Sequence, residues 1–166
     1  MAVKYSTKKD GLAKLMYQAD KLNGHKVNVG CLKGSHAWLA AIHEYGCRIP
    51  VTPKMRAYLH SIGIHLKPST TVIVIPERSF IRAGYDQSKE RVTNHAEMLI
   101  GDVLDGRMTV DKFLKTVGIE LASEIKEYAT NLKTPPNSGM TVMLKGSSNP
   151  LWDTGRMIGG ISHEIE

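Results

Sequence analysis

Cysteine is scarce in this sequence, and long apolar runs are absent. Cys31 and Cys47 are the only cysteines among 166 residues. Two are too few for a disulfide framework, so we expect free thiols. No stretch approaches the roughly 20 consecutive apolar residues that cross a bilayer, and residues 1–10 lack the apolar segment and the cleavage site of an export signal. We therefore expect a soluble protein, without a membrane partner, that is made and folds in the cytoplasm.

Several catalytic and nucleotide-binding motifs are also missing. The sequence contains no Gly-x-x-x-x-Gly-Lys-Ser/Thr loop, no Gly-x-Gly-x-x-Gly turn after a strand and no Gly-x-Ser-x-Gly elbow. It shows no internal repeat, heptad series or low-complexity tract. Nucleotide, dinucleotide and serine-hydrolase functions therefore lack support, and we expect no cofactor.

Basic residues moderately outnumber acidic ones. Lys and Arg together number 22, and Asp and Glu 16, so the net charge is 22 − 16 = +6. Such an excess suits contact with DNA or with an acidic protein surface, and it is equally ordinary for a solvated surface. Charge alone does not choose among these.

The first quarter of the chain is predicted to form a helix, a strand and a second helix. Apolar residues recur at helical spacing over 11–22. Polar and apolar residues then alternate over 25–32, which predicts a half-buried strand. Ser35 stands where an N-cap would open the next helix, and Gly46 follows that helix where a left-handed residue is favoured.

The middle of the chain is predicted to leave the core and return to it. The prolines of segment 47–69 favour extended backbone, and 54–59 is compatible with one helical turn. The β-branched run 70–75 predicts a strand. Two antiparallel helices are then expected over 92–103 and 110–125, because apolar residues recur there at helical spacing and Thr109 is placed as an N-cap.

The last part of the chain is predicted to be an extended arm and a closing strand. Segment 133–152 is rich in turn-forming residues, and 161–165 is strand-like. The expected fold class is therefore α+β, with a small, mainly antiparallel sheet packed with helices and two long protruding loops, about 47–69 and 133–152. The length fits one structural domain over 1–166, because a single core becomes efficient at roughly 100 to 150 residues.

Asp153-Thr154-Gly155 matches the catalytic loop of aspartic proteases. That chemistry needs two carboxylates that share a proton, so this chain would have to dimerise. Arg156 stands where a small residue is expected, and few residues follow it. We favour a turn and helix cap, in which Asp153 or Thr154 accepts from backbone N–H groups and Gly155 relaxes the backbone.

Four potential zinc ligands lie close together in the sequence. Cys31, His36, His43 and Cys47 do not occur in the closely spaced pairs that metal sites use. We expect ordinary surface or partly packed side chains and no metal.

Basic residues gather around both predicted loops without aromatic residues between them to stack on bases. Contact with DNA would therefore involve phosphates only. A solvated surface, or pairing with acidic patches of neighbouring subunits, is the alternative that we favour. The residues concerned are Lys54, Arg56, Arg78, Arg82, Lys133, Lys145 and Arg156.

Three segments together resemble the tail-completion and virion-morphogenesis proteins of tailed bacteriophages, which act in the region where head and tail join. They are Ile42-His43-Glu44-Tyr45-Gly46, Ile75-Pro76-Glu77-Arg78-Ser79-Phe80-Ile81-Arg82, and Asn149-Pro150-Leu151-Trp152-Asp153-Thr154-Gly155-Arg156-Met157. In that family, a helix ending in Glu-aromatic-Gly leads into an extended loop. An Ile-Pro-x-Arg-x-Phe-x-Arg segment precedes the long helices, and Pro-Leu-x-Asp-Thr-Gly-x-Met introduces a final strand.

The resemblance implies a non-catalytic structural protein located in the virion, at the tail or neck. Its relatives act as tail-completion, neck or tail-terminator proteins, usually in rings that match the sixfold symmetry of the tail. The implied partners are other copies in a hexameric ring, tail-tube, terminator or sheath and connector proteins, and phosphates of packaged DNA. Candidate contact residues lie in and beside the loops and the Asp-Thr-Gly turn: Ile49, Pro50, Lys54, Arg56, Arg78, Phe80, Arg82, Lys145, Trp152, Asp153 and Arg156.

Overall fold

The computed structural model describes the backbone of residues 9–166 and the side chains of all of these except Lys9, Asp10 and Ser35. Residues 1–8, part of the stretch without an export signal, lie outside the described residues. The elements follow one another as α1 Lys9–Leu22, β1 Val27–Gly30, α2 Gly34–Tyr45, β2 Cys47–Pro50, α3 Pro53–Ser61, β3 Val72–Ile75, α4 Phe80–Leu104, α5 Val110–Asn131, α6 Gly139–Lys145, α7 Arg156–Gly159 and β4 Ser162–Ile165. The α+β class is confirmed.

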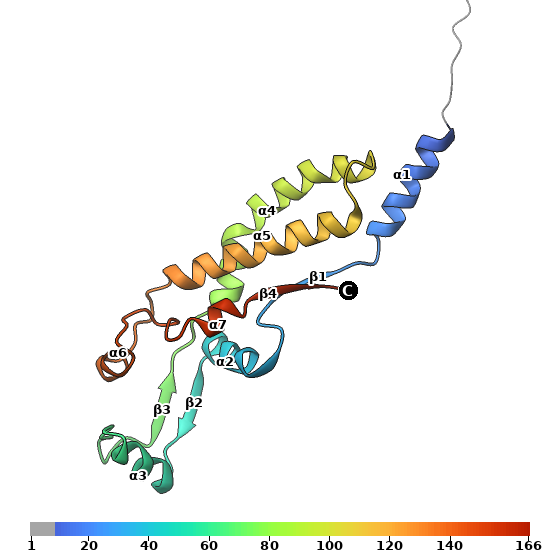
Figure 1. Ribbon diagram of the computed structural model, residues 1–166. Helices are drawn as coiled ribbons and strands as arrows, with labels where there is room; N and C mark the ends of the chain where they lie inside the picture. Colours follow the sequence, from blue (N-terminus) through green and yellow to red (C-terminus); the bar gives the residue numbers. More distant parts are fainter. Residues whose placement is uncertain (1–8) are drawn as a thin grey trace, which may run out of the picture.

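Helices α4 and α5 form the long antiparallel pair at the centre of the molecule (Figure 1). Thr109 caps α5 as predicted, because its hydroxyl accepts from the backbone N–H of Lys112 at 3.2 Å. Helix α4 begins twelve residues before the predicted 92–103 segment, at Phe80. The missed turns bury Gly84 and Ser88 instead of aliphatic residues, so they lack an apolar period. A Cβ on Gly84 would lie 3.2 Å from the Ile125 Cα, so glycine permits the two helices to approach closely.

Strands β1 and β4 pair antiparallel, with Val27 opposite Ile165 and Gly30 opposite Ser162. The pair packs on α5, where Gly118 makes room for the His163 ring. The core beneath this end of the molecule is apolar and includes Phe80, Ile125 and Ile161. The strand predicted over 161–165 thus closes the fold.

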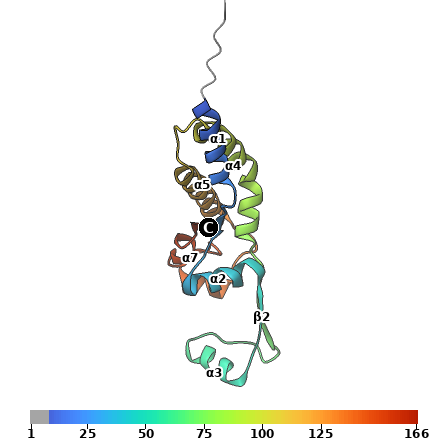
Figure 2. The same ribbon diagram turned by 90° about the vertical axis from the view of Figure 1, so that its right-hand side faces the viewer.

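Strands β2 and β3 form a second antiparallel pair that projects from the body and carries α3 at its tip (Figures 1 and 2). We call residues 47–75 the arm. The single small sheet that we expected is therefore two separate two-stranded pairs. The segment 47–69, expected to be extended with one helical turn at 54–59, contains the strand β2 and the longer helix α3. Pro50 stands at the end of β2, where its missing N–H is tolerated.

The C-terminal segment 133–152 also contains a helix that the sequence pattern did not predict. Ser138 caps α6 by accepting from the Thr141 N–H, and Gly146 ends it in the left-handed conformation. The predicted N-cap at Ser35 is wrong, because α2 begins at Gly34 and its N-cap position is Lys33, which makes no side-chain cap. Over the part of the chain that the structure describes, no helix combines the length and apolar character that a bilayer crossing requires.

Candidate functional site

The three segments that resemble the phage family meet where α2 ends, α4 begins and the C-terminal segment turns back toward α7 (Figure 1). We call this place the hub and define it by Glu44, Arg78, Arg82, Asn137 and Asn149. It lies at the base of the arm, because Gly46 leads from α2 into β2 and β3 leads back toward α4. Gly46 has the expected positive φ of 72°, and a Cβ there would lie 2.8 Å from the Glu77 backbone nitrogen.

Glu44 is the N-terminal cap of α4, although it belongs to α2. Its side chain is only 3% exposed. One carboxylate oxygen accepts from the Ile81 N–H at 2.8 Å, and the other accepts from the Arg82 N–H at 3.1 Å. The residue that precedes α4, Ser79, makes no side-chain cap of its own but donates its hydroxyl to Glu44. A carboxylate in this position satisfies free N–H groups and complements the helix dipole.

Arg82 covers this carboxylate from the solvent side. Its guanidinium donates to Glu44 Oε1 at 2.9 Å and to Glu77 Oε1 at 2.7 Å, and it lies 4.8 Å from the centre of the Tyr45 ring. The hydrogen bonds to Glu44 and then Glu77 raise the pKa of Arg82. The guanidinium therefore ties the end of α2 to the segment that enters α4.

Arg78 ties the same segment to the C-terminal part of the chain. Its side chain is 4% exposed, and burial lowers its pKa. The guanidinium donates to the Pro135 carbonyl at 2.9 Å, to the Pro136 carbonyl at 3.2 Å and to Asn137 Oδ1 at 3.2 Å. These neutral acceptors satisfy the buried cation and the carbonyl groups of an irregular segment at once.

Asn149 organises the turn that opens the third segment. Its side-chain oxygen accepts from the N–H groups of Leu151 and Trp152, and its amide nitrogen donates to the Thr130 carbonyl at the end of α5. The Asn149 carbonyl accepts from Lys145 Nζ at 3.1 Å and from the Asn137 amide at 3.3 Å. The turn is thereby fastened to both α5 and α6.

A hollow of about 420 Å³ lies beside the hub, and its polar lining combines two cations, Lys145 and Arg156, with the carboxylate of Asp153 and neutral groups. His43 lines it, and burial, Arg78 and Lys145 lower its pKa, in that order. The pKa of Lys145 is also lowered, by burial first, with Asp153 opposing the shift and Arg78 adding to it. The remaining polar lining comes from His36, Asn137, Thr141, Thr154 and Arg156.

The prediction for the Asp-Thr-Gly turn is correct for its backbone conformation but wrong for the side-chain cap. Gly155 has the positive φ that a relaxed glycine turn predicts, at 74°, and it is itself the N-cap of α7. Asp153 and Thr154 are exposed, and no side chain caps this helix, so the predicted carboxylate or hydroxyl cap is wrong. The Trp152 ring lies 3.2 Å from where a Cβ of residue 155 would be, which crowds out a side chain.

Two of the predicted contact residues are inaccessible to a partner. Phe80 is 0% exposed because it fills the core between α4 and α5, and Arg78 is buried on carbonyl oxygens. Both predictions are wrong, because a residue of a recognisable motif can pack inside its own chain instead of facing a partner. Ile49, Arg56 and Lys145 are half-buried, whereas six candidates are exposed: Pro50, Lys54, Arg82, Trp152, Asp153 and Arg156.

Arg56 repeats in the arm what Arg78 does in the hub. Its guanidinium donates to the carbonyls of Leu66, Lys67 and Thr70, at 3.2, 2.9 and 2.6 Å. It thereby holds the return loop against α3. Glu44, Asn137 and Asn149 of the hub were not predicted as site residues. The usable signal for Glu44 was an acidic residue on the otherwise apolar face of α2.

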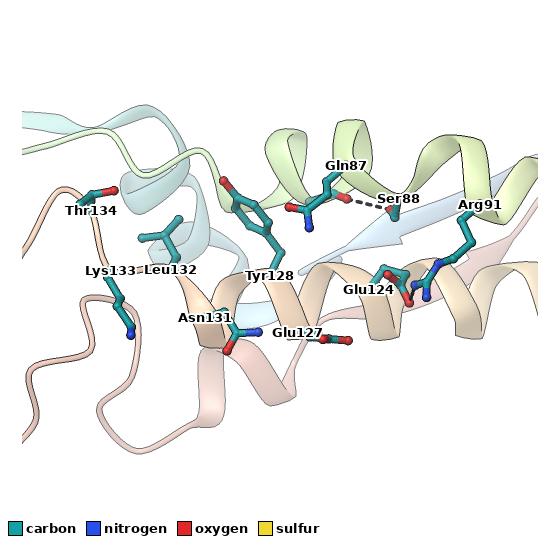
Figure 3. Close-up of a pocket in the computed structure, with 11 residues that line it drawn as sticks. Gln87, Ser88, Arg91, Glu124, Glu127, Tyr128, Asn131, Leu132, Lys133 and Thr134 are labelled. Atoms are coloured by element: carbon teal, nitrogen blue, oxygen red, sulfur yellow. Dashed lines mark hydrogen bonds and ion pairs between the residues drawn. The ribbon is translucent and has the colours of Figure 1, made fainter.

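A larger hollow of about 620 Å³ lies between α4 and α5 and is separate from the hub (Figure 3). An ion pair between Arg91 and Glu124 crosses it from one helix to the other. The Ser88 hydroxyl donates to the Gly84 carbonyl at 2.7 Å within α4. None of the predicted contact residues lines this hollow, which forms a polar seam between the two helices.

The four potential zinc ligands do not converge. Cys31 and Cys47 are free thiols, the first donating to the Met157 carbonyl at 3.4 Å. Within residues whose side chains the structure describes, no three His, Cys, Asp or Glu side chains gather as metal ligands.

No family model, no curated protein and no solved structure matches this chain.

Proposed function

We propose that this protein is a non-catalytic structural component of a tailed-bacteriophage virion, a tail-completion, neck or tail-terminator protein that closes the tail where it joins the head. The observation that carries the proposal is the meeting of the three family-like segments in one hub, in which Glu44 and Arg78 are buried. Glu44 of the first segment caps the helix that the second segment opens. Arg78 of the second segment donates to the side chain of Asn137. Asn137 in turn donates to the carbonyl of Asn149, which belongs to the third segment. Three short motifs that together build one site support a relationship to the phage family better than three motifs scattered over the fold would.

The arm supports a role in contacts between subunits. It projects from the hub (Figure 2) and exposes the apolar side chains of Tyr58, Ile62 and Val74. Lys54 and Pro50 are exposed on it as well. Projecting segments with apolar tips supply the reach that a ring component needs toward neighbours beside, above and below it. We place contacts with other copies in a hexameric ring, and with tail-tube, sheath or connector proteins, on this arm.

We propose that the ring forms on the end of the tail, from copies that are soluble monomers beforehand. Contacts between one patch and a different patch of the next copy close into a ring only at the correct rotation, which a template can impose. Light scattering of the purified protein, alone and with isolated tails, tests this step. A hexamer that forms without tails would count against templating.

Particles made without the protein test the function directly. We expect full heads beside unjoined tails in electron micrographs, and normal infectious particles would overturn the proposal. A finer version compares Tyr58→Glu at the apolar tip of the arm with Ser69→Glu, which makes the same change of charge at an exposed polar position of the arm. We expect the first variant to abolish joining and the second to retain it, with equal thermal stability for both purified chains.

Contact with packaged DNA is proposed to be limited to phosphates and to few residues. Arg56, Arg78 and Lys145 direct their N–H groups at backbone carbonyls. Exposed Lys54, Lys133 and Arg156 remain for phosphate oxygens. We expect weak duplex binding that falls with added salt, and no binding at low salt would remove DNA from the partners.

A further inference from the structure

Helix α1 meets the rest of the molecule with its polar side. The Lys14 side chain lies over Gly106 in the turn between α4 and α5. Gln18 and Lys21 border a hollow against Val110 and Leu114 of α5. Of the apolar face predicted for this helix, Leu22 at its end packs into the core. The orientation is the reverse of what an amphipathic helix adopts when its own domain covers it.

The apolar side of α1 consequently faces solvent. Leu12 is 67% exposed, Leu15 42% and Met16 59%. These three residues and Ala19 form one stripe along the helix, at the i, i+3, i+4 and i+7 positions. Exposed apolar stripes of this kind mark protein contacts. We therefore expect the surface of another molecule to cover this stripe.

A matching apolar surface lies open on the same molecule. A groove of about 300 Å³ runs between α4 and α5 and is lined almost entirely by apolar atoms. Val92, Ala96 and Ile100 form one wall, and Val117 and Leu121 belong to the other. Tyr85 stands at one end with half of its surface exposed.

Length and charge favour α1 as the occupant of this groove. At about 1.5 Å per residue, the wall from Tyr85 to Ile100 is roughly 22 Å long, and the stripe from Leu12 to Ala19 is roughly 10 Å long. Asp20 borders the stripe on α1, and the groove carries Lys89 nearer Tyr85 and Glu97 nearer Ile100. Among the residues whose side chains are described, Lys89 forms an ion pair with Asp86 alone, at 3.4 Å and in an exposed position. An acid on one surface thus has a base available on the other.

We propose that α1 of one copy of this chain lies in the α4–α5 groove of a second copy, with Asp20 beside Lys89. The contact joins two different surfaces, so the pair retains one free groove on the first copy and one free stripe on the second, as successive subunits of a ring require. The role of this contact in a ring rests on the proposed function, whereas the contact itself can be measured with the purified chain.

Crosslinking between two singly substituted chains tests the contact. Met16→Cys and Thr93→Cys place one thiol on the stripe and one on the groove, both at positions where the wild-type side chain is exposed. Mixed at about millimolar concentration and oxidised, the two full-length chains should give a disulfide-linked pair of residues 16 and 93, above the background of unsubstituted protein. Lys21→Cys, on the body-facing side of α1, is the matched control and should give little product with Thr93→Cys.

Charge exchange sharpens the assignment. Asp20→Lys should reduce the yield of the link between residues 16 and 93 by about twofold to fivefold, the range for an exposed ion pair. Lys89→Asp in the partner chain should restore it. A link between residues 16 of two copies alone would indicate pairing of α1 helices, and no link at any concentration would indicate a different protein as partner. Either result overturns the proposal.

The two proposals fail separately. A chain that forms the link but is absent from purified particles would overturn the virion role and leave the contact intact. A chain that is present in particles but forms no link would overturn the contact and leave the virion role.

Discussion

The hub and the arm use the same chemical device in different surroundings. In each, one arginine donates to three acceptor oxygens of an irregular segment, Arg78 in the hub and Arg56 in the arm. The hub places these bonds over an apolar core, and both Glu44 and Arg78 are buried. Helix α3 of the arm has no buried residue, and its return loop depends on backbone bonds and Arg56.

The difference teaches where stability and reach reside in this molecule. Buried hydrogen bonds cost free energy when one partner is removed, because the other is left without water. Exposed bonds are replaced by water at little cost. We therefore expect the hub to contribute to global unfolding and the arm to open locally, available to order against a neighbour.

The largest expected effect comes from the core under the hub. Phe80→Ala removes a fully buried ring and should lower the free energy of unfolding by about 3–5 kcal/mol, through lost burial and the cavity that remains. Denaturant unfolding followed by circular dichroism measures it. Tyr58→Ala at the exposed tip of the arm is the control and should change stability little; equal losses would contradict the division of the molecule into core and arm.

The carboxylate of the hub comes next. Glu44→Gln replaces a charged cap that accepts from two backbone N–H groups, and we expect a loss of about 2–3 kcal/mol. Glu77→Gln changes an exposed carboxylate that contacts the same Arg82, and it should cost less than about 1 kcal/mol. Similar values for the two variants would show that Arg82, and not the capping of α4, determines the effect.

The paired arginines compare the two regions most directly. Arg78→Met should lower the free energy of unfolding by about 1–3 kcal/mol, because the carbonyls of Pro135 and Pro136 lose their donor in a buried site. Arg56→Met should leave global unfolding nearly unchanged and accelerate amide exchange over residues 64–71 alone. Global destabilisation by Arg56→Met would place the arm within the cooperative unit.

The smallest effect is a pH dependence from His43. Its pKa is lowered in the folded state by burial and by the nearby Arg78 and Lys145. The unfolded chain therefore binds a proton more readily, so the stabilising contribution is complete above the ordinary histidine pKa of about 6.5 and declines as the pH falls below it. Unfolding measured between about pH 7.5 and 5.5 should show this decline, and His43→Gln should flatten it. An unchanged slope in the variant would assign the effect to another group.

The elements that the sequence predicted well are those defined by their own residues. Helix α5 follows from its apolar spacing and the Thr109 cap, and β3 follows from a β-branched run. The missed elements depend on partners: β2 is a strand because β3 lies beside it, and the first turns of α4 are stabilised by Glu44 and close contact with α5. Such stabilisation leaves no local pattern.

The sequence predicted which segments form the site but not what each residue in those segments does. The family-like motifs contain Glu44, Arg78, Phe80 and Asn149, but the pattern could not distinguish a residue that faces a neighbour from one that faces its own core. Phe80 and Arg78 were predicted to contact other subunits for that reason.

The sequence by itself determined the α+β composition, the long helical pair and the turns, because caps, glycine conformations and apolar spacing act over a few residues. Only the tertiary structure decided which charges are buried. Glu44 and Ile81 are 37 positions apart, and Arg78 and Pro135 are 57 apart. Burying a charge is favourable only where distant segments supply its hydrogen-bond partners, and that supply exists only in the folded chain.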